Sequence, residues 1–221
     1  LAGYAARCMA GEKLKDIGFT EEVALPYTAV KEAVFPFVKF PGVDVTLTPE
    51  MKSTGEVMAI DIDRDIAFFK SQLASGSHLP SKGNVFLAVK DEDKDGVVPL
   101  ARKLAEMGFG IYATRGTSTR LWDEGIQTQA IYRISRGRPN VLDLIREKQV
   151  DWIVNTSEPG AEAMLDDVKM RSSAIIHGIP ISTTLAGFAA SLSGLDDYER
   201  FGELSVCTLQ EYHRKLKMAN A

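Results

Sequence analysis

The chain has 221 residues, of which 45% are apolar and 25% are charged, close to the average of compact globular proteins. Its net charge of −4 argues against a nucleic-acid surface, since binding a phosphate backbone needs a concentrated basic face. No stretch approaches the roughly 20 apolar residues of a membrane span, and the first residues lack the layout of a signal peptide. We therefore expect a cytoplasmic protein that binds neither nucleic acid nor membrane.

The cysteines and histidines are too scattered to form a metal site or a disulfide framework. Cys8 and Cys207 stand far apart, and the three histidines are equally dispersed. A lone histidine is more often structural or solvated than a ligand. We therefore predict no metal and no catalytic histidine.

The first 80 residues show little regular alternation of strands and helices. An Ala-rich, helix-like stretch, Leu1–Met9, opens a sequence that does not begin with methionine, so the chain reads as a fragment. A strand is expected at Glu56–Ile60 and an amphipathic helix at Asp65–Leu73. The Ser- and Gly-rich segment Ala74–Gly83 is the best linker candidate. We therefore predict one domain over 1–80 and a second over 83–221.

From Gly83 onward, short β-branched or aromatic runs alternate with helical periodicity, a pattern typical of βαβ units. This alternation predicts an α/β fold with a parallel five-stranded sheet and flanking helices in three layers. Expected strands are 85–89, 111–113, 129–134, 152–154 and 179–181. Expected helices are 93–107, 118–124, 139–148, 162–177, 185–192 and 209–218, with Gly108 as a C-cap, Pro139 in a first turn, and Thr183 or Thr184 as an N-cap.

Four loops follow predicted parallel strands and should meet at one edge of the sheet, where helix N-termini favour anions. The segment Thr114–Thr117 has the ingredients of a phosphate cradle, because Gly116 permits close backbone approach and two hydroxyls can donate. Lys94 and Arg133 would add positive charge. Taken alone, such a segment is more often only a helix cap, and Asn155 with Thr156 is equally an Asx-type turn that ends the fourth strand. The convergence of four loops favours a binding site, whereas no catalytic motif is present.

Two segments of the first half carry a specific family resemblance. Lys39-Phe40-Pro41-Gly42-Val43-Asp44 and Pro49-Glu50-Met51-Lys52-Ser53-Thr54-Gly55-Glu56-Val57-Met58 resemble the tail of the second ATP-grasp unit in carbamoyl-phosphate synthase large chains. The segment from Gly83 to Met218 resembles the methylglyoxal-synthase-like domain that ends those chains. The resemblance extends over the whole sequence.

The resemblance implies that the terminal domain binds a nucleotide effector such as UMP or IMP. Arg133 stands where many bacterial members have Lys, and Ser157 where they have Thr, and a guanidinium binds phosphate with a different geometry from an ammonium. In bacterial relatives an ornithine-type effector sits between the two regions, at positions that match Glu56 and Thr183. The positions that match the nucleotide site are Lys94, Thr114, Gly116, Thr117, Arg133, Asn155 and Ser157.

For the parent enzyme, the resemblance implies synthesis of carbamoyl phosphate for pyrimidine and arginine biosynthesis. That reaction uses ATP with Mg²⁺ or Mn²⁺, together with K⁺. Its partners would be the rest of the large chain and a glutamine amidotransferase small chain, and oligomers would form through this domain. The segment that holds the metal would lie upstream of Leu1. The sequence given is therefore expected to have no cofactor and no catalytic residue of its own.

Two other functions remain open. Methylglyoxal synthase shares the resembled fold and removes phosphate from dihydroxyacetone phosphate with an Asp base, which needs a carboxylate beside the phosphate cradle. The loop after the fourth strand offers only Glu158, next to Pro159, where that enzyme has an Asp. A purely structural oligomerisation module would leave the clustered Thr, Lys and Arg side chains without a role.

Overall fold

The computed structural model describes residues 2–21, 25–35, 52–156, 160–202, 204–212 and 214. The chain forms two compact units, Leu1–Pro26 with Cys207–Ala221, and Tyr27–Val206. In the first unit, helix α1 (Ala2–Met9) confirms the predicted N-terminal helix, and the Tyr4 ring packs on Phe19 with centroids 5.0 Å apart. Residues 209–212 are helical, and most of the remaining predicted C-terminal helix lies outside the described residues.

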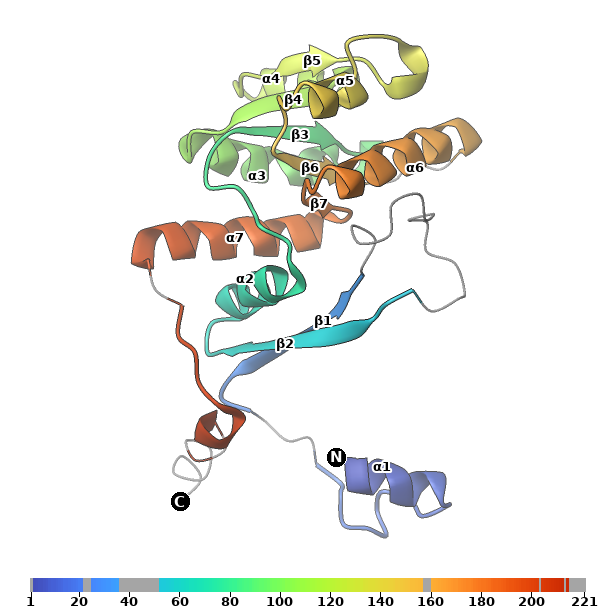
Figure 1. The fold of residues 1–221 in the computed structure, drawn as a ribbon, viewed down its shortest axis with the longest axis vertical. Coiled ribbons are helices and arrows are strands. Elements are labelled where there is room, and N and C mark those ends of the chain that lie inside the picture. Colours follow the sequence, from blue (N-terminus) through green and yellow to red (C-terminus); the bar gives the residue numbers. More distant parts are fainter. Residues whose placement is uncertain are drawn as a thin grey trace. The chain divides into compact units, whose positions relative to one another are not determined.

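The second unit contains a parallel sheet of five strands, drawn in the upper part of Figure 1. In spatial order it runs β5-β4-β3-β6-β7, and every neighbouring pair is parallel. The predicted α/β fold is thereby confirmed. The strands are β3 (Asn84–Ala88), β4 (Gly110–Thr114), β5 (Gln129–Ile131), β6 (Trp152–Asn155) and β7 (Ile181–Ser182).

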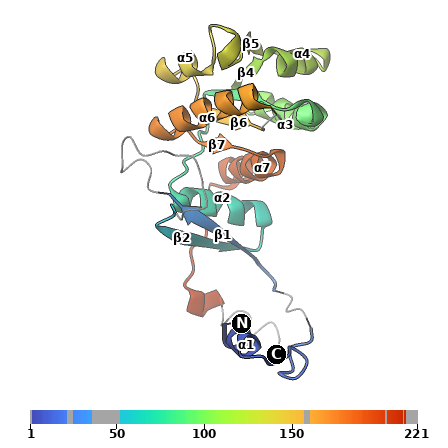
Figure 2. The same cartoon turned by 90° about the vertical axis from the view of Figure 1, so that its right-hand side faces the viewer.

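Helices cover both faces of this sheet, which gives three layers (Figure 2). Side chains alternate in β3, so that Val85 and Leu87 enter one core cluster and Phe86 enters the other. Burial on both faces explains the continuous apolar runs of the central strands. One face carries α3 (Lys94–Glu106), α4 (Arg115–Asp123) and α7 (Leu185–Phe201), and the other carries α5 (Val141–Arg146) and α6 (Ala161–Ile176).

Several predicted boundaries differ from the observed ones. Pro139 does not lie in the first turn of α5, because Asn140 caps this helix and forms a capping box with Asp143. The strand predicted at 129–134 stops at Ile131, and residues Ile134–Arg136 form a short 3₁₀ turn. Gly108 has a φ of 86°, as the predicted C-cap requires. The helix capped by Thr184 continues to Phe201, nine residues beyond its predicted end.

A small antiparallel pair of strands precedes the large sheet within the second unit. Strand β2 (Gly55–Asp61) and helix α2 (Arg64–Ser75) confirm the predicted elements, whereas β1 (Thr28–Val34), which pairs with β2, was not predicted. Glu32 of β1 accepts hydrogen bonds from Ser71 and Gln72 of α2 at 3.0 and 2.7 Å. The motif Lys39–Asp44 lies outside the described residues.

Helix α7 packs against both α2 and the large sheet. Its Phe188 ring meets Trp152 of β6 edge-on at 5.0 Å, and its Tyr198 ring lies 5.2 Å from Phe69 of α2. Phe69 belongs to the same buried cluster as the sheet residues. The second unit therefore continues across the segment 74–83. The domain boundary predicted there stays a prediction.

Candidate functional site

A pocket opens where the carboxyl ends of the central parallel strands meet. From β3 the chain moves to β4 and β5 on one side, then returns past β3 to β6 and β7 on the other. The connections after β3 and β6 lead to helices on opposite faces of the sheet, and such a switch point leaves a crevice. Residues from six segments line the pocket: Phe86, Ala88, Val89, Thr114, Tyr132, Arg133, Ile134, Val141, Asn155, Thr156, Ala163, Asp166, Asp167 and Met170.

The structure brings Lys94 and Gly116 together beside this pocket. A Cβ on Gly116 would stand 2.8 Å from Lys94 Nζ, so the absence of a side chain lets the ammonium group approach the start of α4. Thr114 is the N-cap residue of this helix, and its side chain makes no capping hydrogen bond there. The first backbone N–H groups of a nine-residue helix therefore lie beside a positive charge. This arrangement suits an anion.

The two threonine hydroxyls of the cradle are more enclosed than the sequence suggests. The predicted loop Thr114–Thr117 is the cap and first turn of α4, which begins at Arg115 and not at Ser118. Thr117 is buried; its hydroxyl accepts a hydrogen bond from the Thr114 hydroxyl at 3.2 Å and one from the Val89 N–H at 3.5 Å. Thr114 is buried as well, but it lines the pocket. Of the two, Thr114 is the hydroxyl placed for a ligand.

A carboxylate, that of Asp91, lies close to Lys94 and within the electrostatic influence of Arg133. Asp91 belongs to the 3₁₀ turn Asp91–Asp93 before α3, and its Oδ1 lies 2.5 Å from Lys94 Nζ. The hydrogen bond from Lys94 and the charges of Lys94 and Arg133 lower the pKa of Asp91 below its usual range. Asp91 and Glu92 are exposed, and Asp91 also pairs with the cradle lysine. An anionic ligand of Lys94 would therefore share this cation with the Asp91 carboxylate.

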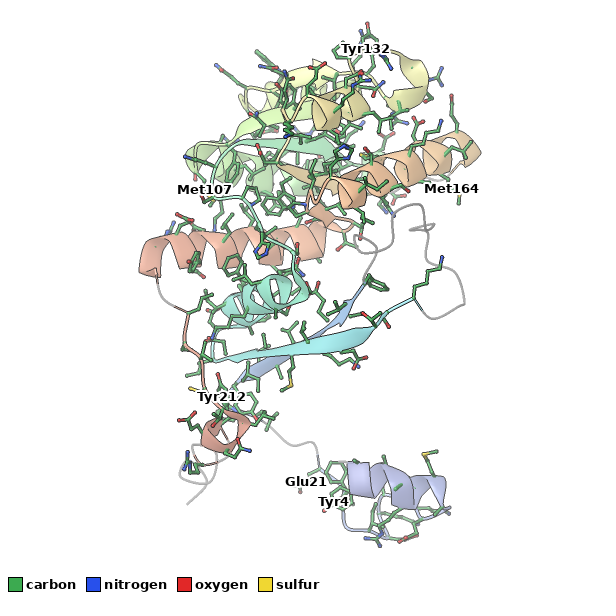
Figure 3. The ribbon with its side chains drawn as sticks, viewed as in Figure 1. Tyr4, Glu21, Met107, Tyr132, Met164 and Tyr212 are labelled. Atoms are coloured by element: carbon green, nitrogen blue, oxygen red, sulfur yellow. The ribbon has the colours of Figure 1, made fainter. Side chains whose placement is uncertain are left out.

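Arg133 lines the pocket just beyond β5, as its predicted role requires. The preceding residue, Tyr132, also lines the pocket and is labelled in Figure 3. The Arg115 guanidinium lies 4.3 Å from the centroid of the Tyr132 ring, a cation–π distance. Sequence reasoning missed both Tyr132 and Arg115, although Arg115 lies within the predicted cradle. Tyr132 therefore holds the Arg115 guanidinium on its ring and is followed in sequence by Arg133.

Asn155 is buried and held by α6. Its amide nitrogen donates to Asp167 Oδ1 at 2.9 Å, and its amide oxygen accepts from Arg171 Nε at 3.0 Å. The side chain therefore bonds to the following helix, and the N–H that an Asx-type turn would use belongs to residue 157. Next to it, the Thr156 hydroxyl accepts from the Lys90 N–H at 3.0 Å and joins the ends of β6 and β3. Ser157 lies outside the described residues.

Two carboxylates of α6 reach the pocket, and sequence reasoning missed them too. Asp166 accepts hydrogen bonds from the Ser135 N–H and hydroxyl at 3.0 and 2.7 Å, which fastens the turn after β5 to α6. Asp167 bonds to Asn155, as described above. The helix after the switch point, α6, passes over the crevice. Polar residues on its sheet-facing side, one to two turns from its start, could therefore have been predicted to line the pocket.

The structure does not bring the two residues predicted for an ornithine-type effector into contact. Glu56 of β2 is exposed and pairs with Lys31 of β1 at 2.8 Å. Thr183 is exposed and precedes the α7 cap Thr184. Within the described ranges, no hydrogen bond or ion pair joins Glu56 to Thr183. Their shared role stays a prediction. None of the described helices has the length and hydropathy needed to cross a membrane.

Comparison with known proteins shows which proteins this chain is similar to. Residues 96–183 match the model of the MGS-like domain. Carbamoyl phosphate synthase large chains from Archaeoglobus fulgidus, Myxococcus xanthus and Pasteurella multocida are 46%, 44% and 44% identical over 97%, 96% and 98% of this chain. The matched segments are 20%, 19% and 20% of those relatives, so the chain spans about one fifth of their length.

Among solved structures, methylglyoxal synthase from Elizabethkingia anophelis is similar with a TM-score of 0.42 and 16% identity, over 58% of this chain and 95% of that one.

Proposed function

Given that the chain contains an MGS-like domain and matches carbamoyl phosphate synthase large chains along nearly its whole length, we propose that it is a regulatory region that binds a phosphorylated nucleotide. One observation carries the proposal. Lys94 lies against Gly116 at the N-terminus of α4, beside a pocket that Arg133 lines. A phosphate there would meet two cations, helix N–H groups and the Thr114 hydroxyl, whose proton would turn from Thr117 to the phosphate.

The proposed ligand is a nucleoside monophosphate such as UMP or IMP. Phosphate would bind at the cationic end of the pocket, while the remainder of the pocket, which includes Phe86, Ile134, Val141 and Met170, offers apolar surface for a base. We further propose that residues 1–80 derive from an ATP-grasp unit. The chain itself would be non-catalytic, and the parent enzyme would make carbamoyl phosphate with ATP, Mg²⁺ or Mn²⁺, and K⁺.

Binding would matter by changing carbamoyl phosphate synthesis elsewhere in a longer protein. We propose that the parent enzyme works with a glutamine amidotransferase small chain and serves pyrimidine and arginine synthesis. A ligand can shift such an activity only by as much as its affinity differs between two states of the enzyme. Helix α7 packs against both the sheet and α2. This packing supports coupling between the pocket and the first half of the chain.

Isothermal titration calorimetry of the chain with UMP, IMP and ornithine tests this proposal. We expect saturable binding of at least one nucleotide, weakened by salt because the main contacts are charged. Inorganic phosphate should compete. If neither nucleotide binds, the proposal fails.

One observation favours a second candidate, methylglyoxal synthase activity. The sequence offered no good carboxylate beside the cradle, yet Asp166 and Asp167 line the pocket. Asp166 already accepts two hydrogen bonds from Ser135, and Oδ1 of Asp167 accepts one from Asn155. A general base has to be within reach of the proton that it removes. An assay of methylglyoxal formation from dihydroxyacetone phosphate separates the candidates, and we expect it to stay at background.

A further inference from the structure

One oxygen of Asp167 is buried without a hydrogen bond. The other oxygen, Oδ1, accepts the amide proton of Asn155 at 2.9 Å. The second oxygen, Oδ2, is buried and has no hydrogen-bond partner among the residues that the structure describes. Arg171 Nη2 lies 3.9 Å away, which is an ion-pair distance and too long for a hydrogen bond. The side chain as a whole is only 13% exposed.

Such an atom calls for a physical explanation. Buried polar groups in folded proteins nearly always have a partner, and a group left without one loses its hydration with no compensation. Asp167 belongs to the lining of the pocket, so the missing partner can come from whatever occupies that space. Asp166, the neighbouring carboxylate in the lining, already accepts two hydrogen bonds from Ser135. The open acceptor is therefore specific to Asp167.

The two sides of β3 offer different chemistry to the pocket: Thr114 ends β4 on one side, whereas Asp167 bonds to Asn155, which ends β6 on the other. Thr114 and Arg133 line the pocket together with Asp167, and the cation Lys94 lies just beside it. A carboxylate repels a phosphate group and attracts a hydroxyl or an N–H. A ligand with phosphate on the cationic side must therefore turn another part of itself toward Asp167.

We infer that Asp167 is a specificity-determining residue that accepts a hydrogen bond from a hydroxyl or N–H on the non-phosphate part of the ligand. The inference rests on the proposed function and names the ligand chemistry that the same pocket selects. In a nucleotide, the donor belongs either to the ribose or to the base. A site that hydrogen-bonds such a donor also rejects analogues that lack it, because its own polar group is then left unpaired.

The variant Asp167→Asn tests this inference with little change of shape. Arg171 donates to the Asn155 oxygen, which fixes the Asn155 amide with its N–H toward position 167. An asparagine at 167 must therefore keep its oxygen toward Asn155, and its NH₂ group takes the place of Oδ2. The acceptor becomes a donor. Glu162→Gln is the matched control, since it removes one exposed negative charge from the same helix.

The experiment is calorimetric titration of the chain and both variants with UMP and with inorganic phosphate. We expect Asp167→Asn to bind UMP about 10-fold or more weakly, the usual effect of losing a hydrogen bond to a charged group. Its affinity for inorganic phosphate should be unchanged or higher, because a negative charge has been removed. Glu162→Gln should bind both like wild type. Circular dichroism checks that each variant is folded.

Analogues identify the donor without any substitution. Wild type should bind 2′-deoxy-UMP or 3′-deoxy-UMP less tightly than UMP if the donor is on the ribose, and 3-methyl-UMP less tightly if it is on the base. Asp167→Asn should not make that distinction. The inference is overturned if UMP binds, but neither Asp167→Asn nor any of the three analogues changes its affinity relative to phosphate. Failure of UMP and IMP to bind wild type overturns the proposed function itself, so the two failures are distinct.

Discussion

Gly194 of α7 lies directly on the backbone of Asp65 in α2: a Cβ at position 194 would stand 2.4 Å from the Asp65 carbonyl oxygen and 2.7 Å from the Phe69 Cβ. The absence of a side chain is what allows these two helices to come so close. The Phe69 and Tyr198 rings also meet at this interface, tilted by 32° with their centroids 5.2 Å apart.

Gly194→Ala should therefore destabilise the second unit. The new methyl group meets backbone atoms that cannot turn away, and overpacking of this kind costs about 1–3 kcal/mol. The improved helix propensity of Ala offsets about 1 kcal/mol. Urea denaturation followed by circular dichroism measures the difference. Gly96→Ala is the control, because its Cβ would meet only the end of the flexible Leu185 side chain. Equal stability of the two variants would contradict the close packing.

Asp91→Asn should increase affinity for UMP and for inorganic phosphate. The Asp91 carboxylate bonds to Lys94 and is stabilised in its charged form by Lys94 and Arg133, so it competes with an anionic ligand for the same cations. Removing its charge leaves Lys94 for the ligand. Calorimetric titration at low salt measures the change. The neighbouring variant Glu92→Gln removes an equally exposed charge that pairs with Lys90, and it should leave affinity nearly unchanged.

Arg133→Ala should weaken nucleotide binding. A hydrogen bond between charged groups contributes about 1.5–3 kcal/mol, so we expect affinity to fall roughly 10- to 150-fold. The salt dependence of binding should also become shallower, because one charged contact is lost. Arg136→Ala is the control, since Arg136 lies in the same turn and pairs with Glu162. Wild-type affinity in a correctly folded Arg133→Ala chain would exclude contact between Arg133 and phosphate.

The pair Asp61–Lys70 should make stability depend on acid pH. Burial alone would raise the pKa of Asp61, but the hydrogen bond and charge of Lys70, together with backbone hydrogen bonds, lower that pKa overall. A carboxyl with a lowered pKa in the folded state stabilises the fold above its unfolded pKa, about 3.9, and this stabilisation is lost as pH falls through the folded pKa. Wild type should therefore lose stability below about pH 4 more steeply than Asp61→Asn.

Substitution of the lysine gives the complementary result near neutral pH. Lys70 also donates to the backbone oxygen of Ser205 at 2.6 Å, and both members of its ion pair are mostly buried. Lys70→Ala should cost about 1–3 kcal/mol, between the values for exposed and buried pairs. Lys31→Ala breaks an exposed pair and should cost well under about 1 kcal/mol. Thermal unfolding at pH 7 and pH 3 compares wild type with the three variants Asp61→Asn, Lys70→Ala and Lys31→Ala. Parallel pH profiles for wild type and Asp61→Asn would contradict the role of Asp61.

The large sheet could be predicted because local pattern and global fold agree there. Each central strand is a short apolar run, each crossover helix has its own periodicity, and Gly108 and Thr184 provide caps that the structure uses. Strand β1 was not predicted because its sequence, TAVKEAV, contains charged residues whose partners lie elsewhere in the chain. Lys31 pairs with Glu56, and Glu32 accepts hydrogen bonds from α2. Contacts between distant segments are not visible in local sequence.

The same distinction explains the site. Thr114 and Arg133 follow directly from the rule that ligands bind at the carboxyl ends of parallel strands, and the structure places both in the pocket. Asp166 and Asp167 enter from a helix, where their orientation depends on how α6 crosses the sheet. Thr117 faces inward because α4 begins three residues earlier than predicted. Strand order was therefore easier to infer than the direction of individual side chains.

The two-sided packing of α7 also constrains how this sequence can evolve. Its Phe188 must match Trp152 in the sheet, while Gly194 and Tyr198 on the same helix must match Asp65 and Phe69. A change of volume on either side shifts the helix, and the other side then has to accommodate the shift. Substitutions in the first half of the chain and in the sheet should therefore co-vary across relatives, with α7 as the element through which one compensates for the other.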